Sequence, residues 1–413
     1  MKRNYFFIKK FIFSIIFLAT LMIFCVGDLI AYFPVYRERG KKLKEVSSVA
    51  ELKGWIQKTD SEISSNVLGK MKFIELYGYI QKLLGKREFN NFAYVKDDDG
   101  MMYYGSVAEL ETDDLEEYAG NVMRLNEYIE SRGAHLLVVI PPTKVLYGAA
   151  NLNKKWTIND PNKRTDRFMS MLQQRGVDAL DLRHYMENTG LSLEEMFFKT
   201  DHHWTPLAAF YGMNRIVERM NELYDLNLDP TGYYRDLSNY SSYTYKSSFL
   251  GSTGENSGAV YSGVDDYTFY WPRCDKEFEW HDYEHDERTK GRLEDSLLYS
   301  NRLITAEDIY DNSMGSVYIR EIVDSERIVN NSDPDAPVLT VLRDSYFSPI
   351  AVFMAPMFSK IDMMWTRNAS GINMEEYIKN EYYNYVILEV YPYNLDAQSF
   401  DFFHEDKQDK INE

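Results

Sequence analysis

An aspartate, two adjacent histidines and a tryptophan occupy residues 201–204, in a chain of 413 residues that contains only seven histidines. Side chains two residues apart in an extended or turn segment point to the same side, so the Asp201 carboxylate can reach the His203 imidazole. Such a pair fixes the imidazole tautomer and stabilises the imidazolium that forms on proton uptake. The dipole of a following helix, with Thr205 as N-cap and Pro206 in its first turn, disfavours a cation at rest. The pattern predicts a general base at His203.

A general base needs a hydroxyl to activate, and the segment PVLTVLRDSYFSP at 337–349 offers one. A buried strand over 337–342, a turn and an apolar helix are expected in that order. This layout resembles a nucleophile elbow without its flanking glycines, with Ser345 at the carboxyl end of the strand. Ser348 precedes Pro349 and is better explained as a helix N-cap. Ser345 is the expected nucleophile, although strand-end serines and capping histidines are also common structural features.

Groups that would stabilise an oxyanion are expected near the nucleophile. We expect them to be backbone N–H groups at Ser345 and Tyr346, assisted by Arg367 beyond the next strand. Arg367 could equally form a surface ion pair. Lys144 follows two prolines at a strand end, on the same edge of the expected sheet. It is a further candidate for the substrate or oxyanion site, and the alternative is a lysine exposed to solvent without a role in the site.

The remaining residues of the 201–204 segment predict structural roles. His202 should face away from Asp201 and is expected to be structural. Trp204 is expected to pack and to lock the loop, and it is also a candidate residue of the substrate or oxyanion site. A metal ion on Asp201, His202 and His203 is not expected, because adjacent histidines should point apart.

A second histidine string competes as a metal site. His281, Glu284 and His285 match the H-x-x-E-H order of inverted zinc peptidases. Such a site needs a long helix and a further ligand, whereas this string lies in an acidic, aromatic region. The sequence therefore predicts no metal and no cofactor.

Strands that alternate with helices are expected to position these residues. A capping pair at Asp113 and Glu116 begins a helix that ends near Gly133, and the apolar run AHLLVVI follows it. Further helix and strand patterns follow at 160–175, VDALDL, 337–342, 360–365 and 383–392. The alternation predicts an α/β fold, a doubly wound parallel sheet in three α/β/α layers, with the site at the carboxyl ends of the strands.

Residues 231–335 interrupt this alternation with segments rich in tyrosine, serine and glycine. They are interpreted as an insertion with β-hairpin character. Two explanations of the tyrosines remain open, namely packing within the hairpin and a sugar-stacking surface.

The N-terminus predicts membrane targeting. Four basic residues in the first ten are followed by an uncharged apolar run from Phe11 to Gly27, which residues 29–32 extend toward the roughly 20 residues that a bilayer requires. An uncleaved signal anchor over 1–33 is expected, with a removed signal peptide as the alternative. Residues 34–90 are expected to be a juxtamembrane linker with helices, and 91–413 the catalytic domain, exported and single-pass.

Bulk composition excludes some classes of protein. The formal net charge of −18 makes nucleic acid an unfavourable partner. Cys25 in the apolar run and Cys274 far from it cannot pair, so stability must come from the core rather than from disulfides.

The string TDHHW, with PPTK upstream and RDSY and NYVILEVYPYN downstream, resembles the DHHW proteins of Gram-positive bacteria. These are similar to the periplasmic alginate O-acetylation proteins, whose catalytic domains resemble SGNH hydrolases. The resemblance implies a catalytic triad of Asp201, His203 and Ser345. It also implies transfer of acetyl groups to an exported polysaccharide, with a membrane-bound O-acyltransferase as acyl donor. Asp344 stands where the alginate proteins have a threonine.

We therefore expect a membrane-tethered O-acetyltransferase of the cell envelope that acts through a serine acyl-enzyme on a cell-surface polysaccharide. A carbohydrate acetyl-esterase and a non-catalytic glycan-binding envelope protein remain alternatives.

Overall fold

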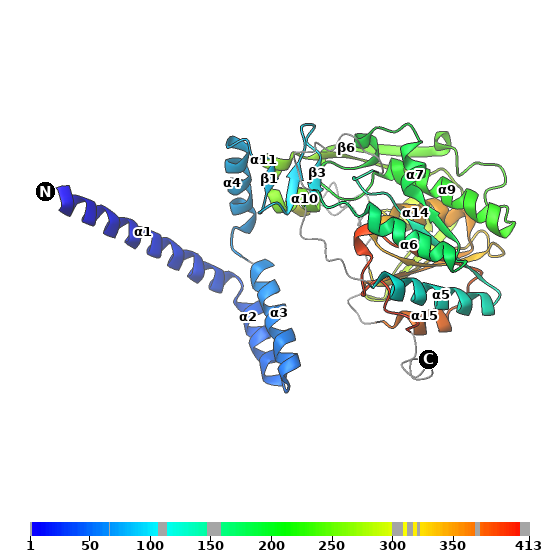
Figure 1. The fold of residues 1–413 in the computed structure, drawn as a ribbon, viewed down its shortest axis with the longest axis horizontal. Helices are drawn as coiled ribbons and strands as arrows, with labels where there is room; N and C mark the ends of the chain where they lie inside the picture. Colours follow the sequence, from blue (N-terminus) through cyan, green and yellow to red (C-terminus); the bar gives the residue numbers. More distant parts are fainter. Residues whose placement is uncertain are drawn as a thin grey trace. The chain divides into compact units, whose positions relative to one another are not determined.

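The computed structural model describes residues 2–65, 67–105, 114–146, 158–299, 309–311, 317–319, 323–367 and 372–404. The chain divides into two compact units, Met1–Tyr77 and Gly78–Glu413, and the boundary falls within helix α4 (Lys70–Leu83). Figure 1 labels the elements of both units. The predicted capping residue Asp113 lies outside the described residues.

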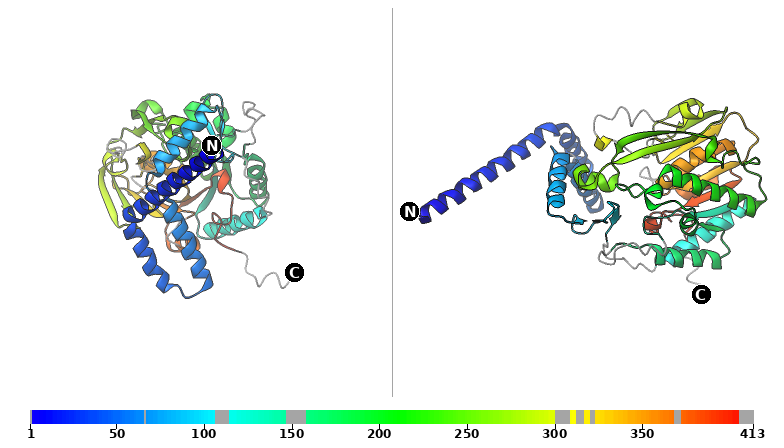
Figure 2. Two further views of the ribbon diagram at one scale, coloured as in Figure 1. Left: turned by 90° about the vertical axis from the view of Figure 1, so that its left-hand side faces the viewer. Right: turned by 90° about the horizontal axis from the view of Figure 1, so that it is seen from above.

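Helix α1 (Lys2–Ala31) forms the predicted apolar segment, and Figure 2 shows it as one continuous helix. Its stretch Phe11–Ala31 is the one helix in the described part of the chain that is long and apolar enough to cross a membrane. Its large apolar side chains are exposed, with Phe13 at 75% and Ile30 at 73%. Lipid suits such a surface better than water, so α1 is consistent with a single-pass anchor or a signal segment.

Two further helices, α2 (Phe33–Lys42) and α3 (Val49–Ser65), complete the N-terminal unit together with the first part of α4. The indole N–H of Trp55 donates to the Arg39 carbonyl oxygen at 3.1 Å, which joins α3 to α2. The Tyr36 hydroxyl donates to Asp28 at 2.6 Å, which joins α2 to the end of α1. The segment expected as a juxtamembrane linker is thus largely helical.

A sheet of eight strands organises the C-terminal unit, in the order β5-β4-β13-β11-β12-β10-β8-β9. The first five strands in this order run parallel, and the last three are antiparallel to their neighbours. The bounds are β4 His135–Ile140, β5 Ala179–Asp181, β8 Glu277–Asp282, β9 Glu287–Arg292, β10 Ser325–Asn330, β11 Val338–Arg343, β12 Lys360–Trp365 and β13 Tyr385–Glu389.

Helices cover both faces of the parallel strands, as Figure 1 shows. Because successive strand residues point to opposite faces, Leu137 and Val139 of β4 pack in the core with α9 and α14, whereas Leu136 and Val138 pack in the core with α5, α6 and α15. The helix bounds are α5 Leu115–Ser131, α6 Asn162–Gln174, α9 Pro206–Tyr224, α14 Ser348–Met354 and α15 Met374–Asn380. The predicted three-layer α/β/α fold is confirmed.

The sheet is mixed rather than wholly parallel, which the sequence pattern did not predict. Strands β8, β9 and β10 come from the expected insertion and extend the sheet beyond β12. In β8 the buried side chains of Phe278 and Trp280 alternate with more exposed neighbours, a pattern typical of antiparallel strands. One part of the insertion therefore extends the main sheet, and another part forms a separate two-stranded sheet.

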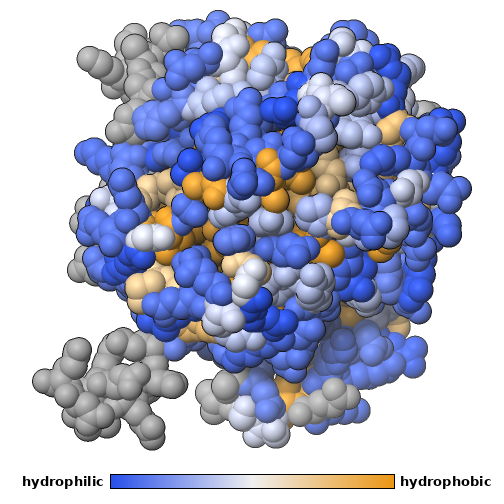
Figure 3. Space-filling model, turned by 90° about the vertical axis from the view of Figure 1, so that its right-hand side faces the viewer, coloured by the Kyte–Doolittle hydropathy of each residue, from blue (hydrophilic) through white to orange (hydrophobic). Residues whose placement is uncertain are grey.

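The expected hairpin is also present. Strands β6 (Tyr240–Phe249) and β7 (Asp265–Pro272) pair antiparallel as a separate two-stranded sheet. The other elements of this unit are β1 Glu88–Phe89, β2 Tyr94–Lys96, β3 Met102–Tyr104, α7 Leu182–Glu187, α8 Leu193–Met196, α10 Ser252–Ser257, α11 Ala259–Ser262 and α12 Leu293–Ser296. On the face in Figure 3, hydrophobic residues form small groups within a mostly hydrophilic surface.

Candidate active site

Asp201 and His203 lie in a bend directly before helix α9. The Thr205 hydroxyl accepts from the Ala208 N–H at 3.2 Å and Pro206 occupies the first turn, so the predicted helix start is confirmed. Asp201 Oδ1 accepts from the backbone N–H of His203 at 2.9 Å and from its Nδ1 at 2.5 Å. Because a carboxylate only accepts, the neutral imidazole carries its proton on Nδ1 and presents Nε2 as an acceptor.

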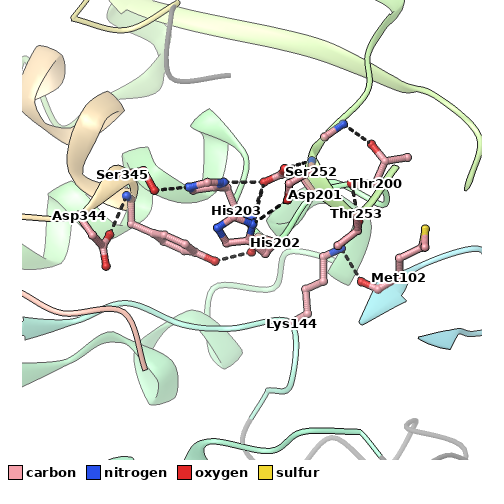
Figure 4. Close-up of polar contacts among 12 residues, drawn as sticks. Met102, Lys144, Thr200, Asp201, His202, His203, Ser252, Thr253, Asp344 and Ser345 are labelled. Carbon is pink, nitrogen blue, oxygen red and sulfur yellow. Dashed lines mark hydrogen bonds and ion pairs between the residues drawn. The ribbon is translucent and has the colours of Figure 1, made fainter. Parts of the chain in front are cut away.

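Ser345 lies at that acceptor. It begins the 3₁₀ turn Ser345–Phe347, which follows β11 at the carboxyl edge of the parallel strands. Its Oγ is 2.5 Å from Nε2 of His203, although 142 residues separate the two in sequence. Figure 4 shows the three side chains in succession, from Asp201 through His203 to Ser345. The geometry allows the serine hydroxyl to give its proton to the imidazole.

Burial and neighbouring charge set the protonation of this cluster. Burial favours the neutral acid at Asp201, but His202, His203 and the hydrogen bonds from His203 outweigh it and hold the pKa of Asp201 well below its usual range. Burial, followed by the nearby His203, lowers the pKa of His202 to about 3. Asp201 is therefore ionised at neutral pH.

His202 does not point away from its neighbour, so that expectation is wrong. Its ring centroid lies 3.9 Å from that of His203, and its Nδ1 is 3.6 Å from Asp201 Oδ1. The cause is local backbone, because residues 201–203 form a bend in which successive side chains do not alternate.

The same bend removes the argument by which a metal ion was not expected here. One ligand atom from each of Asp201, His202 and His203 lies within 4.8 Å of the others. However, both ring nitrogens of His203 already have partners, Asp201 and Ser345. A cation at His203 would have to displace one of these hydrogen bonds.

Two residues of the insertion hold the aspartate, and the sequence analysis missed both. The Ser252 N–H donates to Asp201 Oδ2 at 2.6 Å, and its hydroxyl lies 3.1 Å from Nδ1 of His202. A Cβ on Gly251 would lie 2.1 Å from Cβ of Asp201, so only glycine allows this approach. A Gly-Ser pair at a strand end is too common to have indicated this role.

The turn beneath Ser345 corrects the expectation for Tyr346. Its backbone N–H donates to Asp344 Oδ1 at 2.9 Å and is therefore engaged rather than free for an oxyanion. Its hydroxyl donates to the His202 carbonyl oxygen. Asp344 caps the 3₁₀ turn in the way that Asp and Asn side chains cap helices.

Ser348 is not an N-cap, contrary to expectation. The 3₁₀ turn runs directly into α14, so Ser348 has helical backbone angles, φ −51° and ψ −52°, rather than the extended angles of a capping residue. Its hydroxyl is buried and has no hydrogen-bond partner in the described part of the chain.

Arg367, Lys144 and Trp204 take structural contacts. Arg367 pairs with Asp396 at 2.6 Å and donates to Asn394 at 3.0 Å, which matches the ion-pair alternative. Lys144 is 6% exposed, which rules out a solvated lysine, and its Nζ donates to the Met102 and Lys199 carbonyl oxygens at 2.8 and 3.1 Å. Trp204 is buried and packs as expected, with its indole N–H donating to the Tyr346 carbonyl oxygen at 3.1 Å.

The H-x-x-E-H string lies on strand β8 and the turn after it, not on a helix. His281 pairs with Asp286 at 3.2 Å and His285 with Asp282 at 2.7 Å. The two histidines thus use separate carboxylates, and the helical scaffold of the zinc peptidases is missing from this segment.

Comparisons with known proteins agree with the resemblance seen in the sequence. Residues 98–238 match the family model described as the SGNH hydrolase-like domain of acetyltransferase AlgX. A probable alginate O-acetylase AlgJ of Pseudomonas putida is 24% identical over 129 residues, which cover 31% of this chain and 33% of that protein. The match thus spans about a third of the relative's length. The family model includes Asp201 and His203 but ends before Ser345.

Solved structures show the fold. Bacillus cereus PatB1 with a sulfonyl adduct aligns with a TM-score of 0.58 and 16% identity, covering 75% of this chain and 97% of that one. A DHHW family protein from Eubacterium siraeum aligns with a TM-score of 0.55 and 16% identity, covering 76% and 95%. The SGNH-like fold is confirmed, as is the resemblance to the alginate O-acetylation proteins over residues 98–238 and to a DHHW family protein in fold.

Proposed function

We propose that this protein is a membrane-tethered, extracytoplasmic O-acetyltransferase that moves an acetyl group onto a cell-surface polysaccharide through Ser345, His203 and Asp201. The observation that carries the proposal is the continuous hydrogen-bond chain from Asp201 Oδ1 through His203 to Ser345 Oγ. The alginate O-acetylase match supports the substrate class. The apolar helix α1 supports the tether.

In the proposed mechanism, His203 Nε2 removes the proton of Ser345 as its Oγ attacks the acetyl carbonyl of the donor. Asp201 stabilises the imidazolium, which then protonates the leaving group and leaves an acetyl ester on Ser345. A sugar hydroxyl attacks this ester, with His203 again as base, and the product leaves with the acetyl group. The backbone N–H of Ser345 is the expected oxyanion donor, since that of Tyr346 is engaged by Asp344.

A membrane-bound O-acyltransferase is the proposed acyl donor, because an extracytoplasmic site has to receive its acyl group across the membrane. Hydrolysis differs from transfer only in the nucleophile of the second step. A carbohydrate acetyl-esterase is therefore the second candidate, favoured by the half-buried position of Ser345, which water can reach.

The test uses the full chain in detergent and a chromogenic acetyl ester. Ser345→Ala should abolish ester cleavage, and Asp201→Asn should lower kcat by about 10³–10⁴, because an amide favours the wrong imidazole tautomer. Ser348→Ala is the matched control, since it removes a nearby buried hydroxyl without a hydrogen-bond partner and should retain activity. Cleavage that survives Ser345→Ala would exclude this serine. Acetylated product formed when a polysaccharide is added would distinguish transferase from esterase.

A further inference from the structure

Besides Asp344, a second buried carboxyl group, that of Glu389, lies close to the turn that contains Ser345. Glu389 ends strand β13, next to β11, and is 1% exposed. Its Oε2 accepts from the backbone N–H of Asp344 at 2.9 Å. Glu389 is therefore bonded to the residue immediately before Ser345.

The side chain of Asp344 accepts three hydrogen bonds. Its Oδ1 accepts from the Tyr346 N–H at 2.9 Å, and its Oδ2 accepts from the Tyr391 N–H at 2.9 Å and from the Asn394 side chain at 3.3 Å. Three donors to one buried carboxyl stabilise its ionised form. These bonds also join the turn after β11 to the turn after β13.

Glu389 has no comparable support. Its Oε1 is buried and has no hydrogen-bond donor in the described part of the chain. An ionised carboxylate left there would be desolvated and close to the Asp344 charge, and both effects favour the protonated acid. Burial first, and then Asp344, through its charge and through a hydrogen bond between the two side chains, raise the pKa of Glu389 well above its usual value.

The nearest positive group does not reverse this balance. Arg343, on β11, is fully buried and pairs with the equally buried Glu326 of β10. Arg367 pairs with Asp396 and reaches Asp344 only through Asn394. Burial raises the pKa of Glu326 to about 7 even beside Arg343, and the pKa of Glu389 stays raised although the charge of Arg343 acts to lower it.

We propose that Glu389 is protonated in the folded protein, that its carboxylic acid shares its proton with the Asp344 carboxylate, and that it is thereby a positioning residue for Ser345. No covalent step is involved, and the pair carries one negative charge in total. The catalytic part of this inference rests on the proposed function, whereas the shared proton does not.

The pH dependence has a defined sign. An acid with a raised folded pKa binds a proton in the folded state that the unfolded state has already lost, so this contribution to stability falls as pH rises above about 4.5. Glu389→Gln does not titrate and retains an acceptor for Asp344 N–H and a donor for its carboxylate. The ratio of the unfolding equilibrium constants, wild type over variant, should therefore rise with pH above about pH 5.5, by up to about tenfold per unit, until the folded carboxyl itself loses its proton.

The experiment compares wild type, Glu389→Gln and the control Glu376→Gln, which replaces an exposed carboxyl on α15. Urea unfolding over pH measures the ratio. Infrared spectroscopy at pH 7 should show a protonated-carboxyl C=O component that Glu389→Gln removes and Glu376→Gln leaves, in addition to the contribution of Glu326, whose pKa burial raises to about 7. A ratio for Glu389→Gln that does not change with pH, or an unchanged band, would overturn the proposal.

Kinetics test the positioning role. Glu389→Ala leaves the Asp344 N–H without its acceptor and should lower kcat for ester cleavage about ten- to hundredfold with little change in KM, while Glu389→Gln restores it. An unchanged kcat in the alanine variant would refute the positioning role. A variant series without any ester cleavage, but with the pH slope and the band present, would refute the proposed function and leave the shared proton supported.

Discussion

At the scale of single residues, the candidate site depends on a carboxylate held from two sides. His203 contacts Oδ1 of Asp201 and Ser252 contacts Oδ2, so the carboxylate cannot rotate without breaking a buried hydrogen bond. Leaving a buried donor unpaired costs about 1–3 kcal/mol, which is enough to favour one orientation strongly. The aspartate is thereby preorganised to orient the imidazole.

Gly251→Ala tests this close approach. Its Cβ would collide with Asp201, so we expect a loss of about 1–3 kcal/mol in the free energy of unfolding and a lower kcat. Gly120→Ala in α5 is the control, because its Cβ meets only the end of the Arg124 side chain and should be neutral or stabilising. Urea unfolding and ester cleavage measure both variants, and equal stability of the two would contradict the clash.

Lys144 gives a second pH prediction at this scale. Burial lowers its pKa to about 8, so between about pH 8 and 10.5 the unfolded chain binds a proton that the folded chain does not. Stability should therefore rise with pH in this range relative to Lys144→Met, by about 1 kcal/mol per unit. Urea titrations at several pH values measure the free energy of unfolding of both proteins. A difference in this free energy that does not change with pH would show that the pKa of Lys144 is not lowered by folding.

At the scale of elements, the hairpin β6–β7 combines the two interpretations of its tyrosines. Tyr240 and Tyr267 are buried in the core, as packing requires, while Tyr243 is 54% exposed. Phe269 stacks on Tyr245 and Trp271, with ring centroids 5.9 and 5.2 Å apart. The packing explanation therefore holds for the buried rings, and sugar stacking stays a prediction for the exposed end.

Tyr243→Ala tests the sugar-stacking prediction. Loss of an exposed ring should weaken polysaccharide binding several-fold and leave cleavage of a small acetyl ester unchanged, since aromatic stacking contributes about 1 kcal/mol. Tyr382→Ala, at another exposed tyrosine, is the control. Affinity electrophoresis in a gel that contains the polysaccharide compares them, and equal mobility of the two variants would leave the ring without a role in binding.

At the scale of the whole molecule, the fold divides tasks between two units. The helical unit contains the apolar helix, and the sheet unit contains all three residues of the proposed triad. The net charge of −18 favours solubility of the chain outside its apolar helix, which is consistent with the tethered arrangement proposed above.

Removal of residues 1–33 should move the protein from the membrane fraction to the soluble fraction with ester cleavage within about twofold of the full chain. The physical reason is that Phe11–Ala31, with 21 residues, is the one helix in the described part of the chain that is long and apolar enough to span a bilayer, which requires about 20 residues. Fractionation followed by blotting measures this. Replacement of Phe17 by aspartate is a milder companion variant, and membrane retention of the truncated chain would indicate another attachment.

The sequence by itself determined the α/β layers, the N-terminal helix, the helix start at Thr205 and the pairing of Asp201 with His203. Each follows from short-range pattern, which periodicity and capping chemistry specify locally. The contact of His203 with Ser345, the Gly251–Ser252 support and the Glu389–Asp344 pair depended on tertiary structure, because these residues are far apart in sequence. The mixed sheet, the His202 orientation and the engaged Tyr346 N–H were decided by strand pairing and backbone bends, which no spacing of residue types reveals.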